Sequence, residues 1–136
     1  MIEELKRLSL PAILAVALVM AINILTQNPA AADETIASGS FTGASGHVTS
    51  GGVSVQKTAD GVVVVLGEDF SFDGAPDPKL GFGKDGYVKA TQFSHLEANS
   101  GRQVYKIPAS IDPAQYNEVW VWCERYAVPL GVARLQ

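Results

Sequence analysis

The distribution of glycine is the strongest constraint on how this sequence can fold, because all 13 glycines lie after residue 38. Between them run short segments that are rich in valine and aromatic residues, at 53–55, 62–66, 70–72, 87–93, 104–107, 119–123 and 128–135. Segments of this length and composition are typical of β-strands, and glycine favours the turns that connect them. No long apolar stripe at helical spacing follows Leu25. We therefore predict an all-β fold, an antiparallel sandwich or distorted barrel of about seven to eight short strands.

Local signals place three parts of this fold. Asp60-Gly61 stands between two predicted strands, and both residues readily take the positive φ angles of a hairpin turn. The run that follows, 62–66, contains no polar residue, so we expect a central strand rather than a half-exposed edge. Asp112 followed by proline predicts a single helical turn at 112–115.

The N-terminal region indicates export. Residues 8–25 are almost entirely apolar and follow a Lys-Arg pair, whose charges resist crossing a membrane. Three alanines at 30–32 match the small residues of a signal-peptidase site. We expect a hydrophobic export helix within 1–32, either a signal peptide cleaved after Ala32 or an uncleaved N-terminal membrane anchor. The protein would then be periplasmic or at the cell surface, and the segment, if uncleaved, would be its only contact with the membrane.

Charge and cysteine content exclude several classes of protein. The chain has 10 Lys and Arg against 14 Asp and Glu, a net charge of −4, and no basic cluster, so we exclude nucleic acid as a partner. Its single cysteine excludes an internal disulfide and a cysteine-rich zinc site. No pair of groups is recognisably arranged for acid–base or nucleophilic catalysis, which disfavours an enzyme. We assign residues 33–38 to a tether and 39–136 to the β domain.

The most informative segment is the predicted strand at 119–123. Alternation along a strand places Cys123 on the same face as two valines and places Trp120 and Trp122 on the other face. Two interpretations of the cysteine stay open. It is either a small buried hydrophobe of the core or a thiol used as a redox group, a metal ligand or an intermolecular bridge. The tryptophans are likewise either a packed layer or a binding platform.

His47 and Trp122 are candidates for binding a cofactor beside the cysteine. Glycines flank His47 and would let a ligand approach it closely. Together with Cys123 it would supply two ligands of a haem or copper site. The spacing of these residues matches no established haem or copper motif, so the sequence leaves the cofactor open.

The acidic segment at 69–77 is the candidate recognition loop. Phe70 and Phe72 point to one side of the chain, so Asp69 and Asp73 face solvent. The pattern of oxygen ligands that a calcium loop requires is not met. We expect turns stabilised by Asp side chains, and we take Asp69, Asp73, Asp77 and Trp120 as the candidate residues that contact a ligand.

Several motifs in fixed order resemble a known family. They are Asp-Phe at 69–70, DGAPDP at 73–78, GRQVYKIP at 101–108, YNEVWVWCE at 116–124, and Pro-Leu-Gly at 129–131. This order and spacing are similar to the DM-thirteen domain, also called the electron transfer DM domain. The resemblance extends from Gly39 to Leu135.

The resemblance implies an extracytoplasmic β domain that acts in redox chemistry or electron transfer, with Cys123 at its centre. Larger members join this domain to haem-binding or membrane cytochrome domains. We expect no second domain here, so the redox partner would be a separate protein. The alternative is a non-catalytic β-sandwich module that binds a small molecule, a glycan or a partner protein, with Cys123 filling the core.

Overall fold

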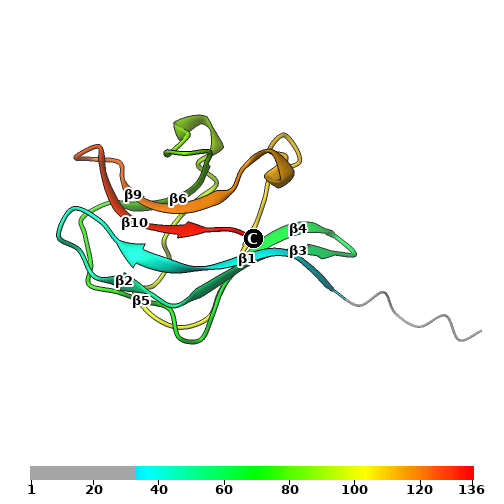
Figure 1. Cartoon of the computed structure of the whole chain (residues 1–136), viewed down its shortest axis with the longest axis horizontal. Helices are drawn as coiled ribbons and strands as arrows, with labels where there is room; N and C mark the ends of the chain where they lie inside the picture. Colours follow the sequence, from blue (N-terminus) through cyan, green and yellow to red (C-terminus); the bar gives the residue numbers. More distant parts are fainter. Residues whose placement is uncertain (1–32) are drawn as a thin grey trace, which may run out of the picture. The chain divides into compact units, whose positions relative to one another are not determined.

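The computed structural model of the chain describes residues 33–136, which are almost entirely β-structure (Figure 1). The strands and the two short 3-10 helices are β1 (Glu34–Gly43), β2 (Thr49–Ser50), β3 (Gly52–Thr58), β4 (Gly61–Leu66), β5 (Ser71–Phe72), β6 (Pro78–Gly83), η1 (Lys89–Thr91), β7 (Ser94–His95), β8 (Gln103–Lys106), η2 (Pro113–Gln115), β9 (Glu118–Cys123) and β10 (Val128–Arg134).

Eight of the strands form one antiparallel sheet in the order β7-β6-β9-β10-β1-β3-β4-β8, and β2 pairs with β5 in a small second sheet. The large sheet curls, so that β6 and β9 lie in one layer and β3 and β4 in the other (Figure 1). The result is a nearly closed barrel. The predicted all-β antiparallel fold is confirmed, in the form of the distorted barrel.

The β3–β4 hairpin forms where the sequence predicted it. Thr58 pairs with Gly61, whose φ of +127° is the positive value that the turn needs. The Thr58 hydroxyl donates to the Gly61 carbonyl at 2.9 Å and accepts from the Asp60 N–H at 3.2 Å. β4 lies between β3 and β8, so the prediction of a central strand is also confirmed.

The core lies between the two layers of the barrel. Its largest fully buried side chains are those of Phe70, Phe82, Leu66, Leu80 and Leu130. Each comes from a strand or from a residue beside one, and the alternation along the strands directs it inward. Burial of this apolar surface is the main favourable term in folding the domain.

The first strand begins earlier than the sequence indicated. We expected a tether over 33–38 and a strand from about Gly39, but β1 begins at Glu34. Residues 34–40 pair with β3 along its whole length, with a register shift between Thr35 and Ala37. Apart from Thr35 and Ile36 the residues of this segment are small or polar and give only a weak strand signal, so pairing with the edge of β3 decides the structure.

The segment at 87–93 is the clearest error among the predicted strands. It forms a loop with the short helix η1 and a single bridge between Gly83 and Tyr87. The Thr91 hydroxyl accepts from the Phe82 N–H at 2.8 Å and lies 2.9 Å from the Phe82 carbonyl oxygen. These hydrogen bonds to β6 hold the segment against the sheet as a loop. Its aromatic residues therefore make apolar contacts although the segment is not a strand.

Two further expectations concern helical structure. The helical turn near 112–115 is present as η2, and the Asp112 carboxylate accepts from the Ala114 N–H at 3.1 Å, so this prediction is confirmed. The expected export helix and its cleavage site lie outside the described residues. Within residues 33–136, no helix is long and apolar enough to cross a membrane.

Candidate functional site

Cys123 is the last residue of β9 and lies on the inner face of the barrel. Its Cα partners are Pro78 on β6 and Val128 on β10. The side chain is only 1% exposed and belongs to the apolar core, and the thiol is free. Among residues 33–136 no hydrogen bond or ion pair reaches its sulfur. The alternation of β9 is therefore as the sequence indicated, and the thiol is closed off from solvent in the folded domain.

The end of β9 that carries Cys123 lies beside two prolines, with Pro78 paired with Cys123 and Pro129 with Trp122. The Pro78 carbonyl accepts from the Leu96 N–H at 2.9 Å, so the backbone of Pro78 bonds toward β7, and the Glu124 N–H donates to the Asp77 carbonyl at 3.1 Å. The β10 register also shifts between Pro129 and Gly131. The pairing around the thiol is therefore irregular on the β10 side, while β6 and β9 stay hydrogen-bonded beyond Cys123.

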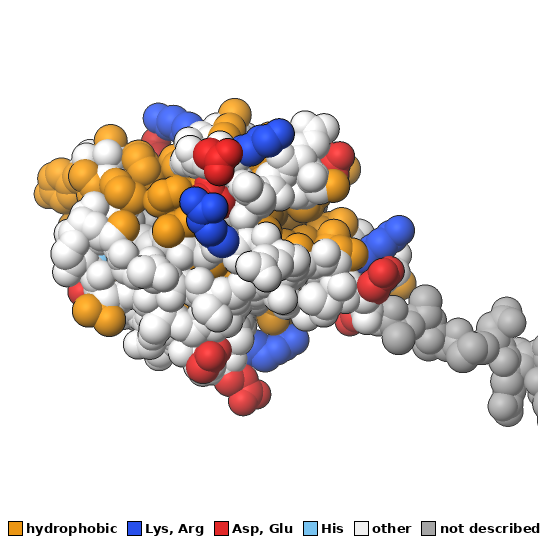
Figure 2. Space-filling view, in the orientation of Figure 1, with side chains coloured by type: hydrophobic (Ala, Val, Ile, Leu, Met, Phe, Trp, Pro, Cys, Tyr) orange, Lys and Arg blue, Asp and Glu red, His pale blue; other side chains and the backbone are white. Residues whose placement is uncertain are grey.

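The turn that follows Cys123, at 124–127, is exposed and strained. Ala127 has a φ of +51°, a left-handed conformation that costs free energy for a residue with a side chain. Tyr126 is 62% exposed at the tip. Figure 2 shows apolar side chains gathered at the end of the domain where Figure 1 places the β9–β10 turn. Contact with another protein at this tip would reach the segment next to the thiol.

The outer face of β6 and β9 carries a layer of aromatic side chains. The Tyr87 ring stacks on Trp122, with ring centroids 4.5 Å apart and an interplanar angle of 13°. Glycines on β6 leave room for these rings. A Cβ at Gly83 would lie 2.3 Å from Trp120 Nε1, and one at Gly81 would lie 2.7 Å from Tyr87 Cε2. Trp120 thus lies over Gly83 and Tyr87 lies over Gly81, two strand residues without side chains.

A buried carboxylate fastens this layer to the loop above it. Glu118 is 4% exposed, and its Oε1 accepts from the Gly86 N–H at 2.8 Å and from Trp120 Nε1 at 3.4 Å. These two N–H groups replace hydrogen bonds to water that the carboxylate loses when it is buried. Glu118 therefore helps to fix the position of Trp120.

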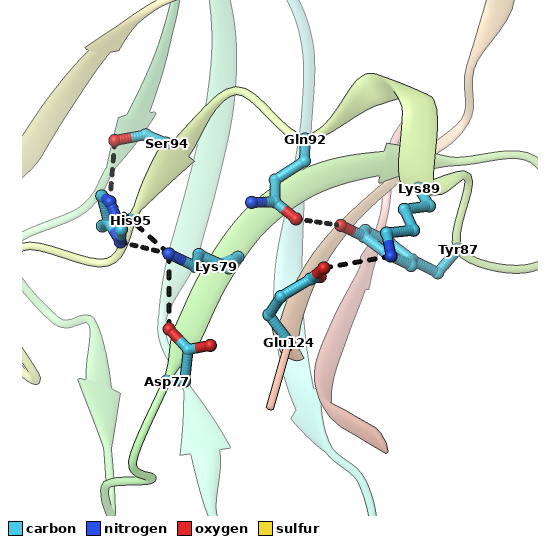
Figure 3. Close-up of polar contacts among 8 residues, drawn as sticks. All are labelled: Asp77, Lys79, Tyr87, Lys89, Gln92, Ser94, His95 and Glu124. Carbon is cyan, nitrogen blue, oxygen red and sulfur yellow. Dashed lines mark hydrogen bonds and ion pairs between the residues drawn. The ribbon is translucent and has the colours of Figure 1, made fainter. Parts of the chain in front are cut away.

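Glu124 and Lys89 lie beside Tyr87 (Figure 3). Glu124 Oε1 is 3.1 Å from Lys89 Nζ, whereas the buried Glu124 Oε2 has no hydrogen-bond partner among the described residues. The Tyr87 hydroxyl donates to Gln92 Oε1 at 3.3 Å. Burial raises the pKa of Tyr87 to about 12, and the negative charge of Glu124 contributes to this rise. The phenol therefore keeps its proton at neutral pH.

Lys79 completes the polar part of the same face. It is the Cα partner of Trp122, and its side chain is only 11% exposed. Lys79 Nζ lies 3.3 Å from Asp77 Oδ1 and 2.5 Å from His95 Nδ1 (Figure 3). Asp77 is thus the counter-ion of a nearly buried lysine. His95 is exposed and lies on β7 beside this lysine.

His47 is held by the acidic segment. Its Nδ1 lies 2.9 Å from Asp73 Oδ1, and its ring lies 5.8 Å from that of Phe72. The contacts of His47 do not include Cys123, and the two residues make no joint metal site here. Within the described part of the chain, no three His, Cys, Asp or Glu side chains come together to hold a metal ion. Among the described residues, the sulfur is enclosed by apolar side chains and has no second ligating side chain beside it, which does not fit a haem or copper centre.

The carboxylates of the predicted recognition loop all have partners within the domain. Asp69 Oδ1 accepts from the Gly52 N–H at 2.9 Å, and Asp73 Oδ2 accepts from the Val48 N–H at 3.0 Å. Asp77 pairs with Lys79 as described. Phe70 and Phe72 are buried between exposed neighbours, so the predicted alternation is correct. These acids stabilise turns and pairings, and their role in recognition stays a prediction.

Asp73→Asn is expected to lower the free energy of unfolding at neutral pH, and the loss is expected to vanish in acid. The hydrogen bond from Val48 and the contact with His47 hold the pKa of Asp73 below its usual 3.8 in the folded chain. A carboxyl with a lowered folded pKa contributes stability above the unfolded pKa and loses that contribution as the pH falls through the folded pKa.

Urea denaturation at pH 7 and at about pH 3 would measure this difference. Glu68→Gln, at an exposed position of the preceding turn, is the control and is expected to show no such pH dependence. An Asp73→Asn variant that is as stable as the wild type at pH 7 would contradict the prediction.

Tyr87, Lys79 and Glu124 were not expected from the sequence to lie on one face. The sequence does contain a pattern that points to this face. Glycine alternates with larger residues at 79–83, which leaves room for bulky side chains from a neighbouring strand or loop. This pattern can be interpreted only when the register of β6 against β9 is known, and the sequence does not determine that register.

Comparison with known proteins adds one finding. A family model described as "Electron transfer DM13" matches residues 40–135, a range that includes Cys123 and nearly all of the barrel. No curated protein and no solved structure matches the chain.

Proposed function

Since the chain belongs to the electron transfer DM13 family, we propose that it is an exported electron-transfer module whose redox group is Cys123. One observation carries the proposal: the family match spans the domain that contains the chain's only cysteine, and that cysteine is a free thiol. The apolar segment at 8–25, which follows a Lys-Arg pair, supports export to the periplasm or cell surface. There the oxidising conditions favour thiol–disulfide chemistry.

The proposed redox step is exchange with a disulfide of a separate partner protein. The Cys123 thiol releases its proton to solvent, and the thiolate attacks one sulfur of the partner's disulfide. One partner S–S bond breaks, a bond between Cys123 and that sulfur forms, and the other partner sulfur leaves as a thiolate. The partner's disulfide is the oxidant. Because the chain has a single cysteine, the product has to be a mixed disulfide between two molecules.

Access to the thiol is proposed to come from local opening at the end of β9. A charged sulfur would be strongly disfavoured among the apolar side chains of the core, so the reaction requires contact with water. The register shift of β10 beside this end and the strained Ala127 in the adjoining turn favour such opening. The exposed Tyr126 next to it offers an apolar contact that a partner can use.

Thiol labelling under native conditions tests this proposal. Cys123 is expected to react slowly with iodoacetamide, through local opening, in the absence of denaturant. The matched control is Val121→Cys in a Cys123→Ser background, because Val121 is equally buried on the same face of β9 and has no proline partner. We expect Cys123 to react at least about tenfold faster than the thiol introduced at position 121, a difference of about 1.4 kcal/mol in opening free energy.

Equal rates for the two thiols, both limited by global unfolding, would contradict a redox role for Cys123. The chain would then be better described as a binding module with a cysteine in its core. The control also separates local from global opening, since global unfolding exposes both positions together.

A further inference from the structure

The large sheet of the barrel ends in two edge strands, β7 and β8. β7 is two residues long, whereas β8 covers Gln103–Lys106 and is paired along its length with β4 on one side. An edge strand presents backbone groups that have no partner in the sheet, and another chain can pair with them. β8 is therefore the longer stretch of open sheet edge in the described domain.

The register of β8 shows which of its backbone groups are free. The Ile107 N–H donates to the Val62 carbonyl at 3.0 Å, and such pairs recur at every second residue of an antiparallel ladder. Alternate residues of β8 therefore bond to β4. The N–H and carbonyl groups of the residues between them, Val104 and Lys106, point away from β4, and no hydrogen bond reaches them within residues 33–136.

The side chains of β8 alternate between the core and the solvent. Tyr105 is 4% exposed, whereas Val104 is 45% exposed. Arg102 and Lys106 are also exposed and lie on the same side of the strand as Val104. Val104 is the Cα partner of Val65 on β4, which gives this side an apolar centre. The outer side of the edge thus has an apolar residue between two basic residues.

The charge of this edge is opposite in sign to that of the whole chain. No Asp or Glu occurs between Glu97 and Asp112, and none occurs in β4. Arg102 and Lys106 make no ion pair within the described part of the chain. A chain with a net charge of −4 therefore presents two unpaired positive charges along the strand whose backbone is free. Carboxylates on an incoming strand would complement these charges.

The same charges disfavour pairing between two copies of the chain. Two β8 strands that meet antiparallel about Val104 would place Arg102 of each copy opposite Lys106 of the other. Pairing Val104 with Lys106 instead would bring the two Lys106 side chains into diagonal contact. Like charges that face each other across two strands destabilise the pair. Lysine at a sheet edge is a common protection against self-association, but it does not exclude a strand of opposite charge.

We propose that β8 is the docking edge for an extended acidic segment of a partner protein, which joins the sheet as an antiparallel strand. The backbone of Val104 and Lys106 pairs with that of the segment, in the recognition mode called β-augmentation. The segment has an apolar residue opposite Val104. Its residues two positions away on either side are acidic and face Arg102 and Lys106. This inference goes beyond the proposed redox role and does not require Cys123.

A short peptide with this pattern tests the proposal without the natural partner. The probe is fluorescein-labelled TETVTET, which has glutamate two positions from valine on either side. Its fluorescence anisotropy with the full chain is expected to give a dissociation constant of about 100 µM or below, which rises with salt concentration. The charge-reversed peptide TKTVTKT is expected to bind at least about tenfold more weakly. Absence of saturable binding by TETVTET would contradict the proposal.

Methylation of the peptide backbone separates strand pairing from simple attraction between charges. A methyl group on the valine nitrogen removes an N–H that faces β8, and we expect binding to weaken by at least about tenfold. The matched control has the methyl group on the threonine that follows, whose N–H points away from β8, and is expected to bind like the parent peptide. Equal affinities of the two methylated peptides would show that charge alone holds the peptide, and the inference would be wrong.

Val104→Pro removes the corresponding donor from the protein. Proline is tolerated in an edge strand where its nitrogen faces outward, and the hydrogen bonds of β8 to β4 come from other residues. Binding of TETVTET is expected to fall by at least about tenfold, whereas Val104→Thr keeps the N–H and is expected to retain the affinity. Lys106→Gln is expected to weaken binding and to reduce its dependence on salt.

Two further results would overturn the inference. Unchanged binding to folded Val104→Pro would place the peptide elsewhere on the domain. A dimer of the chain that Val104→Pro dissociates, measured by sedimentation, would show that a second copy occupies the edge. If Val104→Pro does not fold, the two methylated peptides still decide the question. Cys123→Ala is expected to bind the peptide like the wild type, so failure at this edge and failure of the thiol proposal are distinguishable.

Discussion

Wild-type protein that has formed a mixed disulfide with glutathione is expected to lose about 3 kcal/mol or more of its unfolding free energy. Cys123 is 1% exposed among apolar core residues, and no space for a tripeptide exists on that side of β9. The adduct can be accommodated only if the strand end between Pro78 and Pro129 stays open. Burial of a polar adduct in the closed core is excluded by its desolvation cost.

Urea denaturation of the isolated mixed disulfide would measure the loss. Hydrogen exchange would locate it, with protection falling in β9, β10 and β6 and remaining in β3 and β4. Cys123→Ala treated with the same oxidised glutathione is the control, since it forms no adduct and introduces no unsatisfied hydroxyl as serine would. An adduct that leaves the stability and the protection of β9 unchanged would show that the thiol is not enclosed as described.

Gly83→Ala is expected to destabilise the domain by about 3 kcal/mol. A Cβ at this position would lie 2.3 Å from the Gly86 carbonyl oxygen and 2.3 Å from Trp120 Nε1. The first of these atoms belongs to the backbone, so the 84–86 turn has to move. Movement of that turn also breaks the hydrogen bond from the Gly86 N–H to buried Glu118. The loss thus combines a steric clash with an unpaired buried carboxylate.

Gly52→Ala is the matched control, because it also replaces a strand glycine but meets no atom closer than 3.7 Å. Its effect is expected to stay within about 0.5 kcal/mol. Equilibrium urea denaturation followed by tryptophan fluorescence would compare the two variants. If the two variants are equally stable, the close contact between Gly83 and Trp120 does not constrain the residue at position 83.

The parts of the fold that depend on neighbouring residues could be predicted from the sequence. The β3–β4 hairpin is one, since Asp60-Gly61 supplies the turn and the valine-rich run after it pairs locally. The capped turn at Asp112 is another. In both cases the residues that decide the structure lie within a few positions of one another, so the local pattern contains the information.

The parts that depend on distant strands could not be predicted in this way. Residues 87–93 have the composition of a strand, but bonds from Thr91 to β6 hold them as a loop over the outer face. Residues 34–38 have only a weak strand signal, yet they form a strand because they pair with the edge of β3. Tertiary contacts outweigh intrinsic β-propensity in both segments, because that propensity reflects how a side chain fits its surroundings.

The same division applies to the candidate site. Sequence alone determined that the domain after the N-terminal region is all-β, that it resembles the electron transfer DM13 family, and that Cys123 shares a face with the valines of its strand, because alternation along a strand is a property of the backbone. Only the tertiary structure decided that this face is closed over the sulfur, and that Tyr87, Trp122 and Glu124 meet on the other face. Both outcomes depend on the register of β9 against β6 and β10, which is set by packing across the whole barrel.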